Sequence, residues 1–145
     1  MIVYIDTNII IDLLAKREPF YKDAYNLFKK IAKEKNLIGY TSVKSITDIY
    51  YIMHKYCHDK DKTMEAINDL ISLLYVADNT DIDLLKSFSS NINDFEDSLI
   101  DELSERLMMT YIVTRNTKDF KGSKVKAITP KECLKMLKLP ELDAG

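Results

Sequence analysis

Short runs of β-branched and aromatic residues alternate with longer segments of helical periodicity along this sequence. Strands are predicted over residues 2–5, 37–40, 74–76, 111–113 and 125–128. Helices are predicted over residues 9–14, 21–31, 43–56, 59–74, 81–88 and 95–107, and after Pro130. Strands and helices that alternate favour a parallel sheet with helices on both faces, because parallel strands need crossover connections. The sequence therefore predicts a three-layer α/β/α fold.

The chain is expected to form a single domain over residues 1–145, a common size for one hydrophobic core. It contains three glycines and three prolines and has no linker or repeat. Cys57 and Cys133 have no CxxC spacing and are too few for a disulfide framework, so we expect a cytoplasmic protein. The N-terminal apolar stretch is interrupted by Asp6 and Asp12, which argues against a signal peptide or a membrane span.

Acidic residues recur where strands end. Asp6 directly follows the first strand, and Asp119 lies in the polar turn after the strand at 111–113. Ligands of parallel α/β folds bind at the carboxyl ends of strands, so both residues are candidates for a site. Asp6 also fits a simple helix N-cap, and polar residues are ordinary in loops.

Two further acids lie on predicted helices. Asp48 falls between Ile46 and Ile49 in an apolar stripe, where a carboxylate needs a partner unless it lies at the solvated edge. Asp94 and Asp97 lie in the first turn of a later helix, where the helix dipole and capping explain acids without any chemistry.

The acids carry more weight together than singly. Carboxylates that converge repel one another unless a cation intervenes, which favours a hard divalent ion, Mg²⁺ or Mn²⁺. Such ions activate water for phosphodiester hydrolysis. His54 and His58 have a spacing that zinc sites use, but without an HExxH motif zinc is disfavoured. A phosphate-binding GxxxxGK[ST] loop is absent from the sequence.

Four segments resemble PIN domains, and most closely the branch of VapC-type toxins. They are IDTNIIIDLL (5–14), SITDIYYIMHK (45–55), NDFEDSLIDELSE (93–105) and YIVTRNTKDF (111–120). The resemblance implies a central five-stranded parallel sheet, an acidic pocket that holds divalent metal, and endoribonuclease activity.

The resemblance also implies roles for single residues. Asp6, Asp48 and Asp97 match the three acids of the family, and Asp6 and Asp97 are the expected metal ligands. Many PIN domains have Asp where this chain has Asn116, which leaves Asp119 as the nearest candidate for the fourth acid.

Neighbouring polar residues are expected to orient these carboxylates or their waters. They are Thr7, Asn8, Asp94, Thr114 and Asn116.

The expected function is a Mg²⁺- or Mn²⁺-dependent endoribonuclease, the toxin of a type II toxin-antitoxin pair whose antitoxin inserts an Arg or Lys into the acidic pocket. Asn116 and the net charge of -2 keep open an alternative, a catalytically weak PIN scaffold that binds RNA or a protein partner. A phosphohydrolase with Asp6 as nucleophile ranks lower, because Asn8 stands where haloacid dehalogenases have a second Asp.

Basic residues near the expected pocket are candidates for phosphate contact, above all Arg115 and Lys118. The others are Lys16, Arg17, Lys121 and Lys124. Solvated surface explains any one of them equally well. Aromatic residues of the early helices could form a homodimer or antitoxin surface or belong to the core: Phe20, Tyr21, Tyr25 and Phe28.

Overall fold

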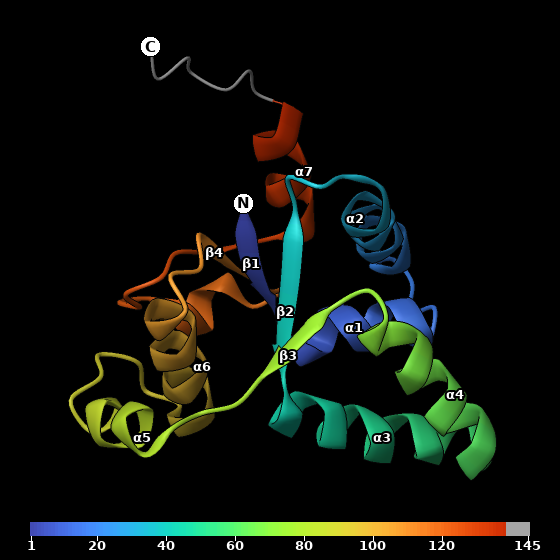
Figure 1. Ribbon diagram of the computed structural model, residues 1–145, viewed down its shortest axis with the longest axis horizontal. Coiled ribbons are helices and arrows are strands. Elements are labelled where there is room, and N and C mark those ends of the chain that lie inside the picture. Colours follow the sequence, from blue (N-terminus) through green and yellow to red (C-terminus); the bar gives the residue numbers. More distant parts are fainter. Residues whose placement is uncertain (139–145) are drawn as a thin grey trace.

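The structure is a computed structural model that describes residues 1–138. Five parallel strands form one sheet in the order β3-β2-β1-β4-β5 (Figure 1). The strands are β1 (Ile2–Ile5), β2 (Ile38–Ser42), β3 (Tyr75–Ala77), β4 (Tyr111–Val113) and β5 (Ala127–Ile128). Strand β1 lies in the centre, paired with β2 on one side and β4 on the other. The predicted five-stranded parallel sheet is confirmed.

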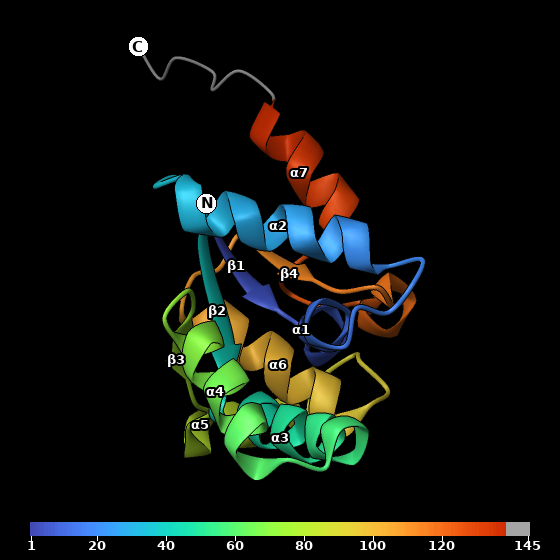
Figure 2. The same ribbon diagram turned by 90° about the vertical axis from the view of Figure 1, so that its right-hand side faces the viewer.

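Seven α-helices connect and cover the strands within residues 1–138. They are α1 (Thr7–Leu14), α2 (Tyr21–Lys33), α3 (Val43–Cys57), α4 (Lys60–Ile71), α5 (Asp81–Ser87), α6 (Phe95–Arg106) and α7 (Pro130–Lys138). In the view of Figure 2, α2 and α7 lie toward the upper end of the strands and α3 and α4 toward the lower end, and residues of all four helices belong to the same core cluster. In the part of the chain described, no helix is long and apolar enough to cross a membrane.

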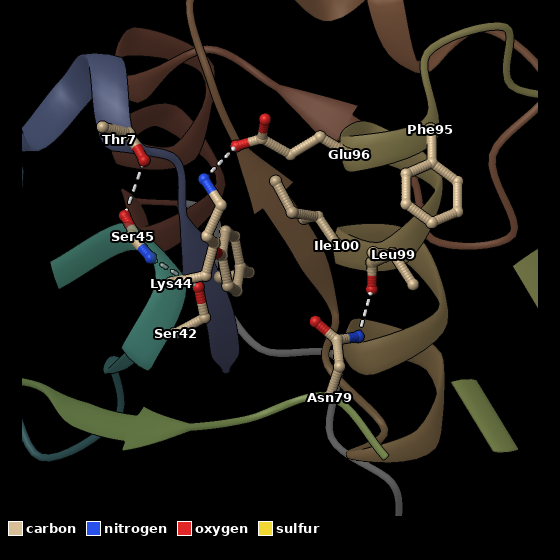
Figure 3. Close-up of a pocket in the computed structure, with 10 residues that line it drawn as sticks. Thr7, Ser42, Lys44, Ser45, Asn79, Phe95, Glu96, Leu99 and Ile100 are labelled. Atoms are coloured by element: carbon tan, nitrogen blue, oxygen red, sulfur yellow. Dashed lines mark hydrogen bonds and ion pairs between the residues drawn. The ribbon is translucent and has the colours of Figure 1, made fainter. Parts of the chain in front are cut away.

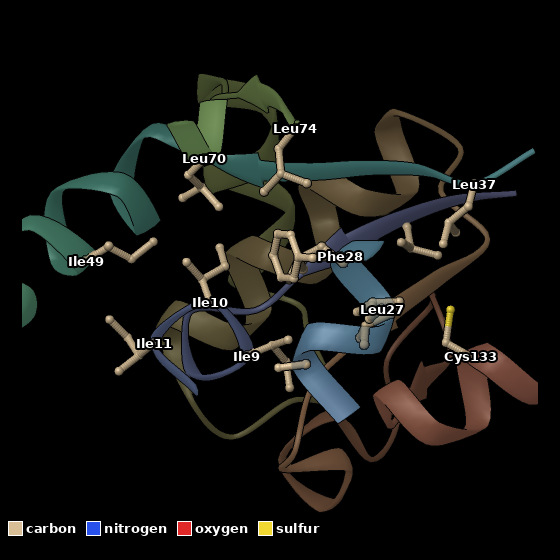
Figure 4. Packing of buried hydrophobic residues seen from close by; sticks show 14 of the residues in the cluster. Ile9, Ile10, Ile11, Leu27, Phe28, Leu37, Ile49, Leu70, Leu74 and Cys133 are labelled. Carbon is tan, nitrogen blue, oxygen red and sulfur yellow. The ribbon is translucent and has the colours of Figure 1, made fainter. Parts of the chain in front are cut away.

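The period-2 alternation of β1 divides the core into two parts. Val3 and Ile5 pack with α1, α2, α3, α4 and α7 in the larger cluster, part of which is drawn in Figure 4. Tyr4, between them, points to the other face and packs with Leu103 of α6 and Ile112 of β4. Helices therefore cover both faces of the sheet, which makes the three layers that the sequence predicts.

The boundaries of the elements differ from the prediction at two informative places. The second strand was expected to end at Tyr40, with Thr41 and Ser42 outside it, but β2 continues through Ser42. Ser42 is at the same time the N-cap of α3, where its side chain accepts a hydrogen bond from Ser45 N. One residue thus ends the strand and starts the helix. The loop after β4 also contains a short 3₁₀ helix over Thr117–Phe120 that periodicity cannot reveal.

Two buried acids of α6 attach the segment that leads into β5. The carboxylate of Asp101 accepts hydrogen bonds from the backbone N–H groups of Lys124 and Val125, both at 2.9 Å. Glu102 forms an ion pair of 2.7 Å with the Lys124 ammonium group. Lys124, a candidate for phosphate contact, is therefore engaged in a structural interaction.

Candidate active site

Asp6 lies where β1 ends and α1 begins. Its Oδ1 accepts a hydrogen bond from Thr7 N (2.8 Å), which makes it the N-cap of α1. Its Oδ2 accepts a hydrogen bond from the hydroxyl of Thr114 (2.8 Å), the residue after β4. The side-chain amide of Asn8 lies 3.4 Å from the same oxygen. The ends of two neighbouring strands and the first turn of α1 therefore fix one carboxylate in place.

Asp97, in the first turn of α6, lines the same cleft as the Asp6 carboxylate. Burial raises the pKa of Asp97 to about 7, helped by the charges of Asp94, Asp6 and Asp119. Burial also raises the pKa of Asp6, and the opposite effect of the hydrogen bonds from Thr114 and Thr7 offsets only part of this rise. Asp94 caps α6 by accepting a hydrogen bond from Asp97 N (2.9 Å). The two acids that sequence analysis assigns to metal binding thus sit within electrostatic reach of each other.

Asp48 projects from α3 and is engaged by a lysine one helical turn earlier. Lys44 Nζ lies 2.6 Å from Asp48 Oδ2 and 3.3 Å from Glu96 Oε1. The Asp48 side chain is 34% exposed, so it lies at the edge of the apolar stripe. Lys44 bridges α3 and α6 across the site and supplies a positive charge between two carboxylates.

These side chains line one open cleft of about 470 Å³, here called the carboxylate cleft. Asp6, Asp48, Glu96 and Asp97 contribute the acids, together with Thr7 and Asn8. Asp119 does not line it. It borders an adjacent cavity of about 560 Å³ with Asp94, Lys118 and Lys121, and Asp97 borders both spaces.

Asn116 also lies outside the carboxylate cleft. Its backbone N–H donates to the Thr114 hydroxyl (3.1 Å), and its side chain is exposed beside a different cavity. The structure therefore brings together the first three predicted acids and leaves Asn116 and Asp119 at the margin.

Two arginines belong to the site, and one fully buried acid forms ion pairs with both of them. Asp12 of α1 forms ion pairs with Arg17 Nε (2.9 Å) and Arg115 Nε (2.7 Å). The Arg115 guanidinium also lies over the ring of Phe20, 3.9 Å from its centre. Both arginines line the carboxylate cleft, where they are available to an anionic ligand.

Sequence reasoning assigned no role to Asp12 or Glu96. The signal for Asp12 was present, because it interrupts the apolar run of α1 just as Asp48 interrupts that of α3. Glu96 sits in a helix first turn, where acids are common for other reasons, so no local signal marks it.

The carboxylates of the cleft suit a hard cation that keeps several of its waters, and not one that is ligated by protein side chains alone. Within residues 1–138, no three His, Cys, Asp or Glu side chains are arranged to hold a metal ion by themselves. Mg²⁺ usually keeps several waters and binds through one or two carboxylates and substrate phosphates. Asp6 and Asp97, with raised pKa values and only oxygen donors, fit that mode. His54 stacks on Tyr50 instead, and His58 is the C-cap of α3.

The remaining candidates divide between surface and core. Lys16, Lys118 and Lys121 are exposed and do not line the carboxylate cleft, although Lys118 and Lys121 border the adjacent cavity. Among the early aromatic residues, Phe28 belongs to the core. Tyr25 is exposed and packs on Tyr21, with 5.9 Å between the ring centres. A homodimer through this face stays a prediction.

A three-layer parallel fold in which acids from the carboxyl end of β1 and from α3 and α6 line one cleft defines an α/β protein whose site is suited to oxygen-bound cations. The sequence profile of the PIN domain matches residues 2–118. The chain therefore belongs to the PIN-domain family. Among curated proteins, none matches the chain in sequence.

Solved structures of toxin-antitoxin proteins share the fold. VapBC2 from Rickettsia felis, bound to a DNA fragment from its promoter, has a TM-score of 0.66 and 20% identity, covering 89% of this chain and 98% of that one. A toxin-antitoxin complex from Klebsiella pneumoniae has a TM-score of 0.64 and 23% identity, covering 88% and 97%. Mycobacterium tuberculosis VapC20, a toxin that cleaves the sarcin-ricin loop, has a TM-score of 0.65 and 12% identity, covering 83% and 95%.

Proposed function

We propose that this protein is a divalent-metal-dependent endoribonuclease and the toxin of a type II toxin-antitoxin pair. The observation that carries the proposal is the meeting in one cleft of Asp6, which follows β1, and Asp97, which lies in the first turn of α6. Within residues 1–138, five carboxylates, those of the cleft and that of Asp12, are near three cationic side chains, Arg17, Lys44 and Arg115. The resulting negative excess favours a divalent cation.

Asp6 and Asp97 are the residues that would hold the ion. When bound there, Mg²⁺ or Mn²⁺ would stabilise the negative charge of the phosphate as a Lewis acid and would lower the pKa of the attacking water. Thr114 and Thr7 keep the Asp6 carboxylate in one orientation through their hydrogen bonds. Arg17 and Arg115 would contact phosphate oxygens of the RNA, since their guanidinium groups suit phosphate geometry.

Lys44 would change partners as substrate binds. It neutralises Asp48 and Glu96 in the structure described, and phosphate or metal in the cleft would compete for all three groups. A cationic side chain of an antitoxin would fit the same acids, as Lys44 does now. The fold shared with toxin-antitoxin proteins supports such a partner.

The test is cleavage of a labelled single-stranded RNA pool by purified protein in Mg²⁺, Mn²⁺ or EDTA. Cutting is expected only with metal, and Asp6→Asn and Asp97→Asn should each lower the rate by at least about 100-fold. Asp69→Asn, at an exposed α4 position, is the matched control purified in the same way. Induced expression in a bacterial host should slow growth with the wild type and not with Asp97→Asn.

The alternative function, a catalytically weak scaffold, predicts another pattern. The Lys44 bridge and the marginal position of Asn116 favour it. Metal binding by the wild type, measured by calorimetry and lost in Asp97→Asn, without any RNA cleavage would support the scaffold. Cleavage that persists in EDTA or in both aspartate variants would contradict the proposed mechanism.

A further inference from the structure

A second cavity of about 300 Å³, here called the side pocket, lies next to the carboxylate cleft. Figure 3 shows Ser42, Lys44 and Ser45 on one side of it and α6 on the other. Its walls on the α6 side are Phe95, Leu99 and Ile100. Small-ligand sites commonly begin at this volume and combine apolar walls with a few placed polar groups.

The side pocket adjoins the carboxylate cleft. Thr7, Glu96 and Ile100 line both spaces. Thr7 is adjacent to Asp6, and Glu96 is adjacent to Asp97. A ligand whose phosphate lies between these two aspartates can therefore place its next chemical group in the side pocket.

Polar groups are found on the wall opposite Phe95 and at the end beside Asn79. Tyr4 Oη and Ser42 Oγ are hydrogen-bonded at 3.0 Å, and burial raises the pKa of Tyr4, so its hydroxyl keeps its proton. Asn79 Nδ2 donates to the backbone oxygen of Leu99 (2.8 Å), which fixes the amide. Within residues 1–138 no hydrogen bond reaches Asn79 Oδ1, so this oxygen can accept one from a ligand.

Phe95 gives the pocket an aromatic edge. Its side chain belongs to the first turn of α6 and the residue is 55% exposed, which is unfavourable for an aromatic ring unless something covers it. Proteins read unpaired RNA bases by stacking them on such rings and by hydrogen bonds to their edges. A flat heteroaromatic ring with a polar edge matches both the apolar walls and the free acceptor.

We propose that the side pocket binds one nucleobase of the RNA, that of a nucleotide next to the cleaved phosphate, and so selects the cleavage site. Phe95 stacks on the base, Leu99 and Ile100 enclose it, and Asn79 Oδ1 accepts a hydrogen bond from its edge. The proposal rests on the proposed ribonuclease function, because it takes the carboxylate cleft as the place of the phosphate.

The experiment uses an oligoribonucleotide that contains one mapped cleavage site. A single abasic ribose replaces each nucleotide flanking that site in turn, and kcat/KM is measured for the wild type, Phe95→Ala and Phe88→Ala. Phe88 is the matched control, because it is 71% exposed and does not line the side pocket. For the wild type, one flanking position should show a loss of roughly tenfold or more when its base is removed.

In Phe95→Ala the same abasic substitution should cost roughly twofold or less, because the contact is already missing. Phe88→Ala should behave as the wild type does. Equal abasic losses in all three proteins, or no loss at any flanking position, would overturn the proposal. Thermal melting of the three proteins checks that they fold equally well.

Binding of the same oligonucleotides, followed by fluorescence anisotropy, separates this proposal from the ribonuclease function. One outcome is that no RNA is cut, but the wild type binds the intact oligonucleotide better than an abasic one and Phe95→Ala does not. This outcome would support the side pocket and contradict the ribonuclease function. If RNA is cut without any base effect, the nuclease stands and the side pocket falls. If a peptide partner binds the wild type and not Phe95→Ala, while removal of RNA bases has no effect in either protein, the proposal is overturned and the pocket belongs to the antitoxin.

Discussion

At the residue scale, the acids of the carboxylate cleft oppose one another's ionisation, which lowers the free energy of unfolding when they are charged. Asp97 has a pKa of about 7 because burial and the neighbouring carboxylates oppose its ionisation. An unfolded chain releases the same proton near pH 4, so between these values the folded protein binds more protons than the unfolded one. The free energy of unfolding therefore falls as pH rises through this window.

Asp97→Asn should remove this pH dependence. In EDTA, the wild type should lose about 1 kcal/mol of unfolding free energy relative to Asp97→Asn between pH 5 and pH 8, a value discounted for the partial exposure of the side chain. Urea denaturation at both pH values measures it, with Asp69→Asn as the control. Parallel pH curves for the wild type and Asp97→Asn would show that the raised pKa is absent.

At the scale of elements, α1 does more than cover the sheet. Its N-terminus fixes Asp6, and its last turns carry Asp12, which connects it to Arg17 in the next loop and to Arg115 after β4. Asp12 is fully buried, whereas the two arginine side chains are 35% and 26% exposed. The same helix thus positions one acid of the carboxylate cleft and two of the cations that line it.

Asp12→Asn should therefore affect both stability and RNA affinity. Loss of the charge leaves two arginines without their anion, and we expect a cost of about 2 kcal/mol in unfolding free energy, less than for a wholly buried pair. Urea denaturation measures the cost, and RNA binding should weaken because the arginines are no longer held. The double variant Asp12→Asn with Arg115→Gln supplies the control, since a real ion pair makes the two losses less than additive.

At the scale of the whole molecule, charge is distributed unfavourably for nucleic acid. The net charge is -2, and within residues 1–138 the cations that line or bridge the carboxylate cleft are Arg17, Lys44 and Arg115. RNA would thus be held by a few phosphate contacts together with metal, and not by an extended basic surface. The single-domain organisation over residues 1–145 stays a prediction, and residues 139–145 lie outside the part described.

The salt dependence of RNA affinity should be shallow. About three phosphate contacts predict a slope of roughly -2 for log K against log salt concentration on a single strand. Fluorescence anisotropy with the wild type in EDTA, where no cutting is expected, measures the slope. Arg115→Gln should reduce its magnitude by roughly 0.7, while Lys29→Gln on α2 should leave it unchanged. A slope steeper than roughly -5 would indicate a basic surface elsewhere.

The sequence by itself determined the layers of the fold and the first acid of the site. Alternation of apolar residues sets which face of β1 enters which core, and the turn residues after Ile5 end the strand where Asp6 caps α1. These features depend on local geometry, so local patterns reveal them. The order of the strands, the neighbours of each acid and the extent of β2 depend on contacts between distant segments.

Only the tertiary structure decided which polar residues meet. It brought Glu96 of α6 to Lys44 of α3 and into the carboxylate cleft, left Asn116 and Asp119 at the margin of that cleft and opened the side pocket beside α6. It also buried Asp12 between two arginines that are five and 103 residues away along the chain. The periodicity of a helix predicts on which face a residue lies. Which charge or cavity lies next to that residue depends on how the helices and strands pack.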